Sequence, residues 1–205
     1  MLISHKHKFI FIHIYKNAGT SISTALLPLI TTKFQRFSHR KLKRIGISYL
    51  NQPCSTHATA SQIMSAIGEE KFKSYFSFCI ARNPWDWQVS LYQYMLKNPC
   101  HHQHELAKKF DGFEDYIDWR CTQEIRLQKD FIYSQNGELL VDFVGRFETL
   151  EKDFEAVCKY IDLPARLPKV NVSNTVPYQK FYTERTQDIV KVAFEPDIAL
   201  FNYSF

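Results

Sequence analysis

The sequence predicts an α/β fold in which a parallel β-sheet is flanked by helices. Three short apolar runs in the 205-residue chain are each followed by a polar turn and then by a helical pattern of apolar residues. Hydrophobic residues make up 45% of the chain and charged residues 23%, which is ordinary for a globular protein. The length suits one compact domain that spans residues 1–205.

The first β-α unit opens with the run FIFIHIY at residues 9–15. This run is rich in aromatic and β-branched residues, which is typical of a buried central strand. Residues 16–19 then predict a turn, and residues 20–30 a helix.

The second unit is predicted as a strand over residues 75–81 and a helix over residues 85–97. The start of this helix has suitable residues, because Asn83 can cap it and Pro84 fits its first position. Asp86 lies in the first turn, where the helix dipole favours a carboxylate.

A third unit is predicted as a strand over residues 139–147 and a helix over residues 150–161 that stops before Pro164. Two more helices are expected, one around FEDYIDW and one that Thr183 caps, which runs through Phe194 and is broken or kinked by Pro196.

The formal net charge of +5 favours anionic ligands. The five cysteines are scattered without a C-x-x-C pair, which argues against a disulfide framework or a zinc site and favours a reducing compartment. The apolar run near the start is too short to cross a bilayer, so a cytoplasmic protein without an integral membrane segment is expected.

The segment KNAGTS at residues 16–21 follows the first predicted strand and opens the first predicted helix. A helix N-terminus presents unpaired N–H groups and a partial positive charge, so it can hold phosphate or sulfate. Lys16 adds a full charge, Gly19 permits a tight turn and close approach of a ligand, and Thr20 and Ser21 add hydroxyl donors. A plain β-α turn is the alternative, and the segment is not a Walker A loop because its lysine precedes the glycine.

Arg82 stands at the end of the second predicted strand, and Ser90 follows two helical turns later. Carboxyl ends of parallel strands share one edge of a sheet, where ligands bind. A guanidinium with a hydroxyl suits a terminal phosphate. Alternatively, Arg82 only pairs with Asp86 and Ser90 is inert. A ligand with phosphate groups at both ends would explain the two anion sites together.

With these motifs in place, the chain resembles the PAPS-dependent sulfotransferase family, in particular carbohydrate sulfotransferases of the heparan 2-O type and their bacterial relatives (PAPS is 3′-phosphoadenosine 5′-phosphosulfate). The resemblance rests on FIHIYKNAGTS at 11–21 and FCIARNPWDWQVSLY at 78–92. The segments VGRFETLEKDF at 144–154 and DIALFNYSF at the end extend it over most of the chain.

The resemblance implies a P-loop-NTPase-like sheet, the sulfotransferase fold, with PAPS as the sulfonate donor, adenosine 3′,5′-bisphosphate as the product and no metal. By position, Arg82 and Ser90 would bind the 3′-phosphate. Trp87 stands where relatives often have arginine, which would alter the neighbouring surface or substrate edge. The 5′-phosphosulfate would be held by Lys16, Asn17, Ala18, Gly19, Thr20 and Ser21.

Transfer of a sulfonate leaves charge on the bridging oxygen, which Lys16 would stabilise. The acceptor hydroxyl loses a proton as it attacks, and relatives place a histidine base between the two motifs, where this chain has His57. Rival bases are Glu148 and the histidines His13, His39, His101, His102 and His104. Of these, His13 is interpreted as a packed strand residue and the HHQH cluster as a solvated turn without assured metal partners.

The acceptor is expected to be a carbohydrate or another hydroxyl compound, because the resemblance points there. The basic stretch from Lys33 to Arg44 could guide a polyanionic sugar, or it is a solvated face. Tyr94, Tyr116 and Trp119 could stack on a sugar or belong to the core. Nucleic acid is not the expected partner.

Two other classes of function remain open on the sequence. A nucleotide-dependent kinase of similar fold would need a Walker lysine and serine, which are missing. A catalytically degenerate protein that binds PAPS, or a polyanion binder, would show binding without turnover.

Overall fold

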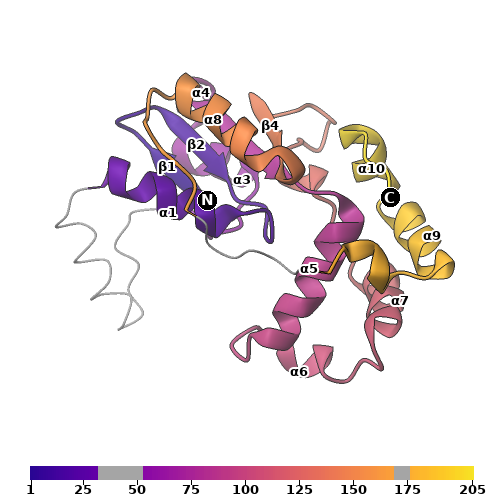
Figure 1. Ribbon diagram of the computed structural model, residues 1–205. Coiled ribbons are helices and arrows are strands. Elements are labelled where there is room, and N and C mark those ends of the chain that lie inside the picture. The colour runs from indigo at the N-terminus through magenta and orange to yellow at the C-terminus, as the bar shows by residue number, and fades with distance from the viewer. Residues whose placement is uncertain (32–52, 169–175) are drawn as a thin grey trace. The chain divides into compact units, whose positions relative to one another are not determined.

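The computed structural model describes residues 1–31, 53–168 and 176–205. In its described parts the chain forms two compact units, one within residues 1–80 and 131–171 and the other within residues 81–130 and 172–205 (Figure 1). The first unit holds a sheet with helices around it, which confirms the predicted α/β class. The second unit is helical in its described parts.

The sheet has four strands in the order β1-β2-β3-β4. β1 pairs with β2 antiparallel, whereas β2 and β3 are parallel, with Ile12 opposite Cys79. Because β2 and β3 are parallel neighbours, their carboxyl ends lie at the same edge of the sheet. The strands are β1 Leu2–Ser4, β2 Phe9–Ile12, β3 Phe76–Ala81 and β4 Phe143–Arg146.

The core of the first unit lies between the sheet and the helices α1 (Gly19–Ile30) and α8 (Leu150–Tyr160). Alternating strand side chains, Phe9 and Phe11 from β2 with Phe78 and Ile80 from β3, form one face of this core. The intervening side chains Ile10, Ile12 and Cys79 are equally buried, so both faces of the central strands are covered. This explains why the two runs are apolar throughout instead of alternating.

Two short helices, α3 (Ala60–Ile67) and α4 (Glu69–Lys73), precede β3. Thr59 and Gln62 form a capping box at the start of α3, where each side chain accepts a hydrogen bond from the other's backbone N–H. The capping box fixes where α3 begins, and His57 stands two residues before its first member, Thr59. The 3₁₀ turn η2 (Phe147–Thr149) leads from β4 into α8.

The second unit is built around α5 (Pro84–Lys97). Its N-cap is Asn83, whose Oδ1 accepts a hydrogen bond from the backbone N–H of Trp85, and this confirms the predicted start of the helix. The other elements that begin in this unit are α6 (His104–Ala107), α7 (Phe113–Gln123), η1 (Lys129–Phe131), η3 (Tyr178–Phe181), α9 (Glu184–Ala193) and α10 (Glu195–Phe201).

Several predicted boundaries are wrong. β2 ends at Ile12 and not at residue 15, because the chain then turns into a loop with left-handed residues. β4 is shorter than the predicted strand over 139–147, because Leu139 pairs with Tyr133 in a separate bridge. α9 ends before Pro196, which lies in the first turn of α10 and starts that helix rather than breaking one. The sequence did not predict β1, because a strand of three residues is too short to show a periodic pattern.

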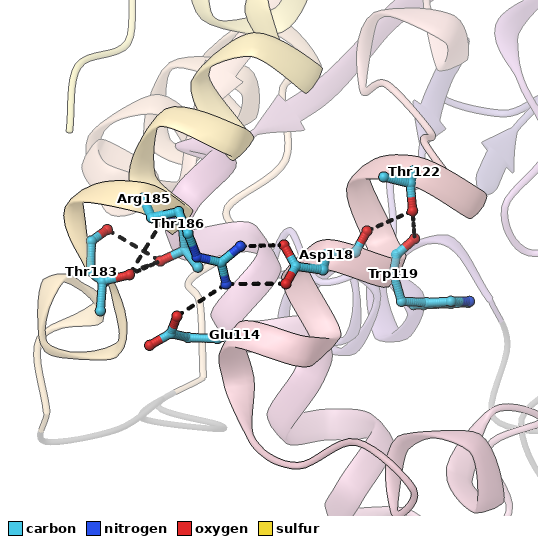
Figure 2. Close-up of polar contacts among 7 residues, drawn as sticks. All are labelled: Glu114, Asp118, Trp119, Thr122, Thr183, Arg185 and Thr186. Carbon is cyan, nitrogen blue, oxygen red and sulfur yellow. Dashed lines mark hydrogen bonds and ion pairs between the residues drawn. The ribbon is translucent and has the colours of Figure 1, made fainter.

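The helices α7 and α9 are joined by the Arg185 guanidinium (Figure 2). It donates to both carboxylate oxygens of Asp118, at 2.8 and 3.1 Å, and to Glu114 at 3.1 Å. These bonds raise the pKa of Arg185 further above its usual value. Thr183 and Thr186 cap the start of α9 beside it, as predicted for Thr183.

Within the described ranges, no helix is long and apolar enough to cross a membrane.

We predict that Arg185→Ala lowers the melting temperature by no more than a few degrees, because ion pairs between exposed side chains stabilise proteins only weakly. Thermal unfolding at low salt and at about 1 M salt, where such pairs are screened, measures the effect. Lys191→Ala, at an exposed position of the same helix, is the matched control. If Arg185→Ala lowers the melting temperature equally at high salt, the lost stability does not come from the ion pairs.

Candidate active site

The loop between β2 and α1 contains two non-glycine residues with left-handed backbone, Lys16 with φ 63° and Ala18 with φ 58°. This conformation costs about 1–2 kcal/mol for such residues, and it concentrates at ligand-binding sites. Turns of this kind direct successive backbone N–H groups to one side, which makes a concave site for an anion. A loop with left-handed residues at these two positions is therefore a candidate for holding an anion.

Ala18 is the N-cap of α1 and has no side-chain acceptor for the first N–H groups of the helix. Those groups and the helix dipole favour an anion at this end. Thr20 is exposed and Ser21 is buried in the first turn of α1. Together with the half-buried Lys16, the predicted donors of residues 16–21 thus belong to one loop and one helix turn.

Asn17 fixes this loop to the sheet. Its side chain is buried, and Nδ2 donates a hydrogen bond of 2.8 Å to the carbonyl oxygen of Ile80 in β3. The loop after one central strand is thereby tied to the carboxyl end of its parallel neighbour. Ile80 stands two residues before Arg82 in the chain.

Gly19 is required because the imidazole of His13 packs against it. A Cβ atom at residue 19 would lie 1.8 Å from Nε2 of His13. The turn itself does not use the glycine, since the left-handed residues are Lys16 and Ala18. The expectation that Gly19 provides the tight turn is therefore wrong, and its role is to make room for a side chain.

His57 contacts His13 beside this loop. The two rings have centroids 4.5 Å apart, and Nδ1 of His57 lies 2.9 Å from the backbone oxygen of His13. A carbonyl oxygen only accepts, so Nδ1 of His57 carries the hydrogen and donates it. In the neutral ring Nε2 then holds the lone pair, so it is the nitrogen that can accept a proton. The ring of Tyr15 stands edge-on to His57, with centroids 6.0 Å apart.

The two histidines stay neutral near pH 7. The pKa of His13 is lowered to about 3, mainly by burial. Repulsion from the charged forms of the terminal amine and of His57 also contributes to this decrease. Burial also lowers the pKa of His57, although its bond to the His13 carbonyl acts in the opposite direction. A neutral His57 can accept a proton, so its charge state fits the role of a base.

In the second unit, Arg82 forms an ion pair with Asp86. Nε of Arg82 donates to the Asp86 carboxylate at 2.7 Å, and the exposed fractions of the two side chains are 4% and 23%. This pair was the alternative interpretation of Arg82. It orients the guanidinium, and it leaves phosphate binding possible because a guanidinium has five N–H donors. Ser90 lies four residues after Asp86 in α5, so it lies on the same face of the helix.

Trp87 is fully buried and packs edge-on against Phe194. The expectation that it alters the surface or the substrate edge is wrong, because the side chain belongs to the core of the second unit. Tyr116 is also fully buried, which favours the core over sugar stacking, whereas Tyr94 is 40% exposed.

In the first unit, His57 contacts His13 and Tyr15 beside residues 16–21, and His13 packs against Gly19. Arg82 and Ser90 belong to the other compact unit, where Arg82 pairs with Asp86. His39 and the basic stretch from Lys33 to Arg44 lie outside the described residues. The contacts of His13 and Tyr15 with His57 had no signal in the sequence, because they join positions more than 40 residues apart. His13 is also not a strand residue, since β2 ends one position before it.

The chain matches the model of the family described as "Sulfotransferase family" over residues 1–204, so it belongs to the sulfotransferase family and is a transferase of that class. It is also similar to an uncharacterized protein of Archaeoglobus fulgidus, with 30% identity over 125 residues, which are 59% of this chain and 97% of that protein.

We predict that Gly19→Ala destabilises the protein by roughly 1–3 kcal/mol, the usual cost of overpacking, because the new methyl group must displace the His13 imidazole. Chemical denaturation measures the loss.

The double variant tests the cause. In a His13→Ala background the imidazole is gone, so Gly19→Ala should be neutral or stabilising, as alanine favours a helix over glycine. An equal loss in both backgrounds would show that the ring of His13 is not what requires glycine at residue 19.

Proposed function

We propose that this protein transfers the sulfonate group of PAPS to a hydroxyl group of an acceptor, with residues 16–21 around the 5′-phosphosulfate and His57 as the base. The observation that carries the proposal is the left-handed loop at Lys16 and Ala18, followed by a helix N-terminus and flanked by a histidine in the base tautomer. Family membership supplies the reaction class.

In the proposed reaction, the acceptor oxygen forms a bond to sulfur as the bond from sulfur to the bridging 5′-phosphate oxygen breaks. The electron pair stays on the bridging oxygen, where the Lys16 ammonium and the N–H groups of the α1 N-terminus stabilise the charge. The hydroxyl proton moves to Nε2 of His57. The Nδ1–H bond to the His13 carbonyl then stabilises the resulting imidazolium.

The 3′-phosphate of the donor is assigned to Arg82 and Ser90. The ion pair with Asp86 supports this role, because a guanidinium already oriented by a carboxylate loses less freedom when a phosphate binds. Ser90 adds a hydroxyl from the same helix face as Asp86. Both residues match the positions at which the family resemblance expects them.

The acceptor class that we propose is a carbohydrate, on the basis of the resemblance to carbohydrate sulfotransferases. We further propose that both compact units belong to one sulfotransferase domain, because the family match spans them both. A cytoplasmic location is proposed from the reduced, scattered cysteines.

We predict that adenosine 3′,5′-bisphosphate binds without metal and that Arg82→Ala weakens this binding roughly 100-fold, because a charge-assisted contact to phosphate is lost. Isothermal titration calorimetry of both proteins measures it, with ATP plus magnesium as the competing ligand. Tighter binding of ATP, or no binding of the bisphosphate, would overturn the proposal and favour a kinase or a polyanion binder.

We predict that the acidic limb of the pH profile of kcat/KM lies below the usual histidine pKa of about 6.5, because burial lowers the pKa of the base. Activity is full while His57 is neutral and falls as the pH drops through its pKa. His57→Ala should reduce kcat by about 10²–10⁴-fold and leave bisphosphate affinity unchanged.

His102→Ala is the matched control, because this histidine is exposed and lies in the HHQH turn. It should keep both the rate and the pH profile of the unaltered protein. A His57→Ala protein with an unchanged rate would show that another group takes the proton.

A further inference from the structure

The backbone of Arg82 is held by a side chain that no motif contains. Gln128 Oε1 accepts a hydrogen bond of 2.9 Å from the Arg82 N–H, and Gln128 Nε2 donates one of 2.8 Å to the Arg82 carbonyl oxygen. Arg82 follows the last residue of β3 and precedes α5, so its peptide groups lie outside both elements. The amide of Gln128 binds them at two points, as a neighbouring strand would.

Gln128 is held in turn by Asp197 in the first turn of α10. One Asp197 oxygen accepts from the Gln128 N–H at 2.7 Å, and the other accepts from the Lys129 N–H at 2.9 Å. Gln128 and Asp197 are fully buried, and Arg82 is 3% exposed. Burial raises the pKa of Asp197 to about 6, against the two backbone bonds that favour its charged form. A carboxylate thus stays buried where its two oxygens bind neighbouring peptide groups.

The neighbouring residue is anchored by the same part of the chain. Asn83 Nδ2 donates to the Ser204 carbonyl oxygen at 2.7 Å and to the Tyr178 hydroxyl at 3.3 Å. The last part of the chain therefore holds two successive residues. It holds Asn83 directly, and it holds Arg82 through Gln128. These bonds come in addition to the one by which Asn83 caps α5.

We propose that Gln128, held by Asp197, is a positioning residue for Arg82 and thereby for recognition of the 3′-phosphate of the donor. The inference rests on the proposed function, which assigns that phosphate to Arg82. A guanidinium on a long side chain binds phosphate well only when its backbone is fixed, since small displacements weaken a charge-assisted contact. Gln128 provides the fixed backbone, and the Asp86 ion pair orients the charged end.

The test compares adenosine 3′,5′-bisphosphate with adenosine 5′-phosphate, which lacks the 3′-phosphate. The dissociation constant of adenosine 5′-phosphate divided by that of the bisphosphate measures recognition of the 3′-phosphate alone, and this quotient is called the ratio below. Gln128→Leu, of similar size, removes both hydrogen bonds to Arg82 and should reduce the ratio about tenfold while the affinity for adenosine 5′-phosphate stays unchanged. Asp197→Asn leaves one of the two peptide N–H groups without an oxygen and should reduce the ratio less.

Gln88→Leu is the matched control. Gln88 is equally buried in the same unit, but its Oε1 binds Tyr116 and Arg120. The substitution should lower stability and leave the ratio unchanged. A Gln128→Leu protein that weakens both nucleotides alike, or neither, would show that Gln128 only satisfies buried peptide groups.

Arg82→Ala separates the two proposals. If this variant leaves the ratio unchanged, the assignment of the 3′-phosphate to Arg82 fails, and the role of Gln128 fails with it. If Arg82→Ala reduces the ratio and Gln128→Leu does not, the proposed function stands and the positioning role is wrong.

Discussion

The imidazole of His13 fills the space in which a side chain of residue 19 would stand, and much of the candidate site depends on this contact. The ring packs on the first turn of α1, and the backbone oxygen of the same residue accepts the Nδ1–H of His57. One residue thus contacts both the loop that opens α1 and a neutral histidine. Because the contact excludes even a methyl group, the loop and His13 cannot shift independently without a loss of packing.

Several features near the predicted site reduce stability instead of adding to it. Lys16 and Ala18 adopt left-handed backbone, and Asp197 is a carboxylate whose burial raises its pKa. Arg82 is a buried cation that only its partners make tolerable. Features of this kind persist where the surrounding structure supports them, and they gather at functional sites. The capping boxes and the aromatic core supply the support in each unit.

The sequence predicted the class of fold and the helices of the β-α units well, because these depend on local signals. Asn83 caps α5 as expected, and Thr183 caps α9. Strand ends were predicted less well. Residues 13–15 continue the apolar pattern of β2, but they leave the sheet to reach the loop, and no periodicity distinguishes a buried strand residue from a buried loop residue.

The sequence by itself determined the α/β class, the turn that opens α1, and the places of Arg82 after a strand and Ser90 within the next helix, since each follows from local spacing along the chain. Only the tertiary structure decided why residue 19 is glycine, which tautomer His57 adopts and what holds the backbone of Arg82. Residues 19 and 57 contact His13, and residue 82 contacts Gln128, which Asp197 holds in turn. The last two lie far away in the chain, and side-chain packing of this kind leaves no periodic trace in a sequence.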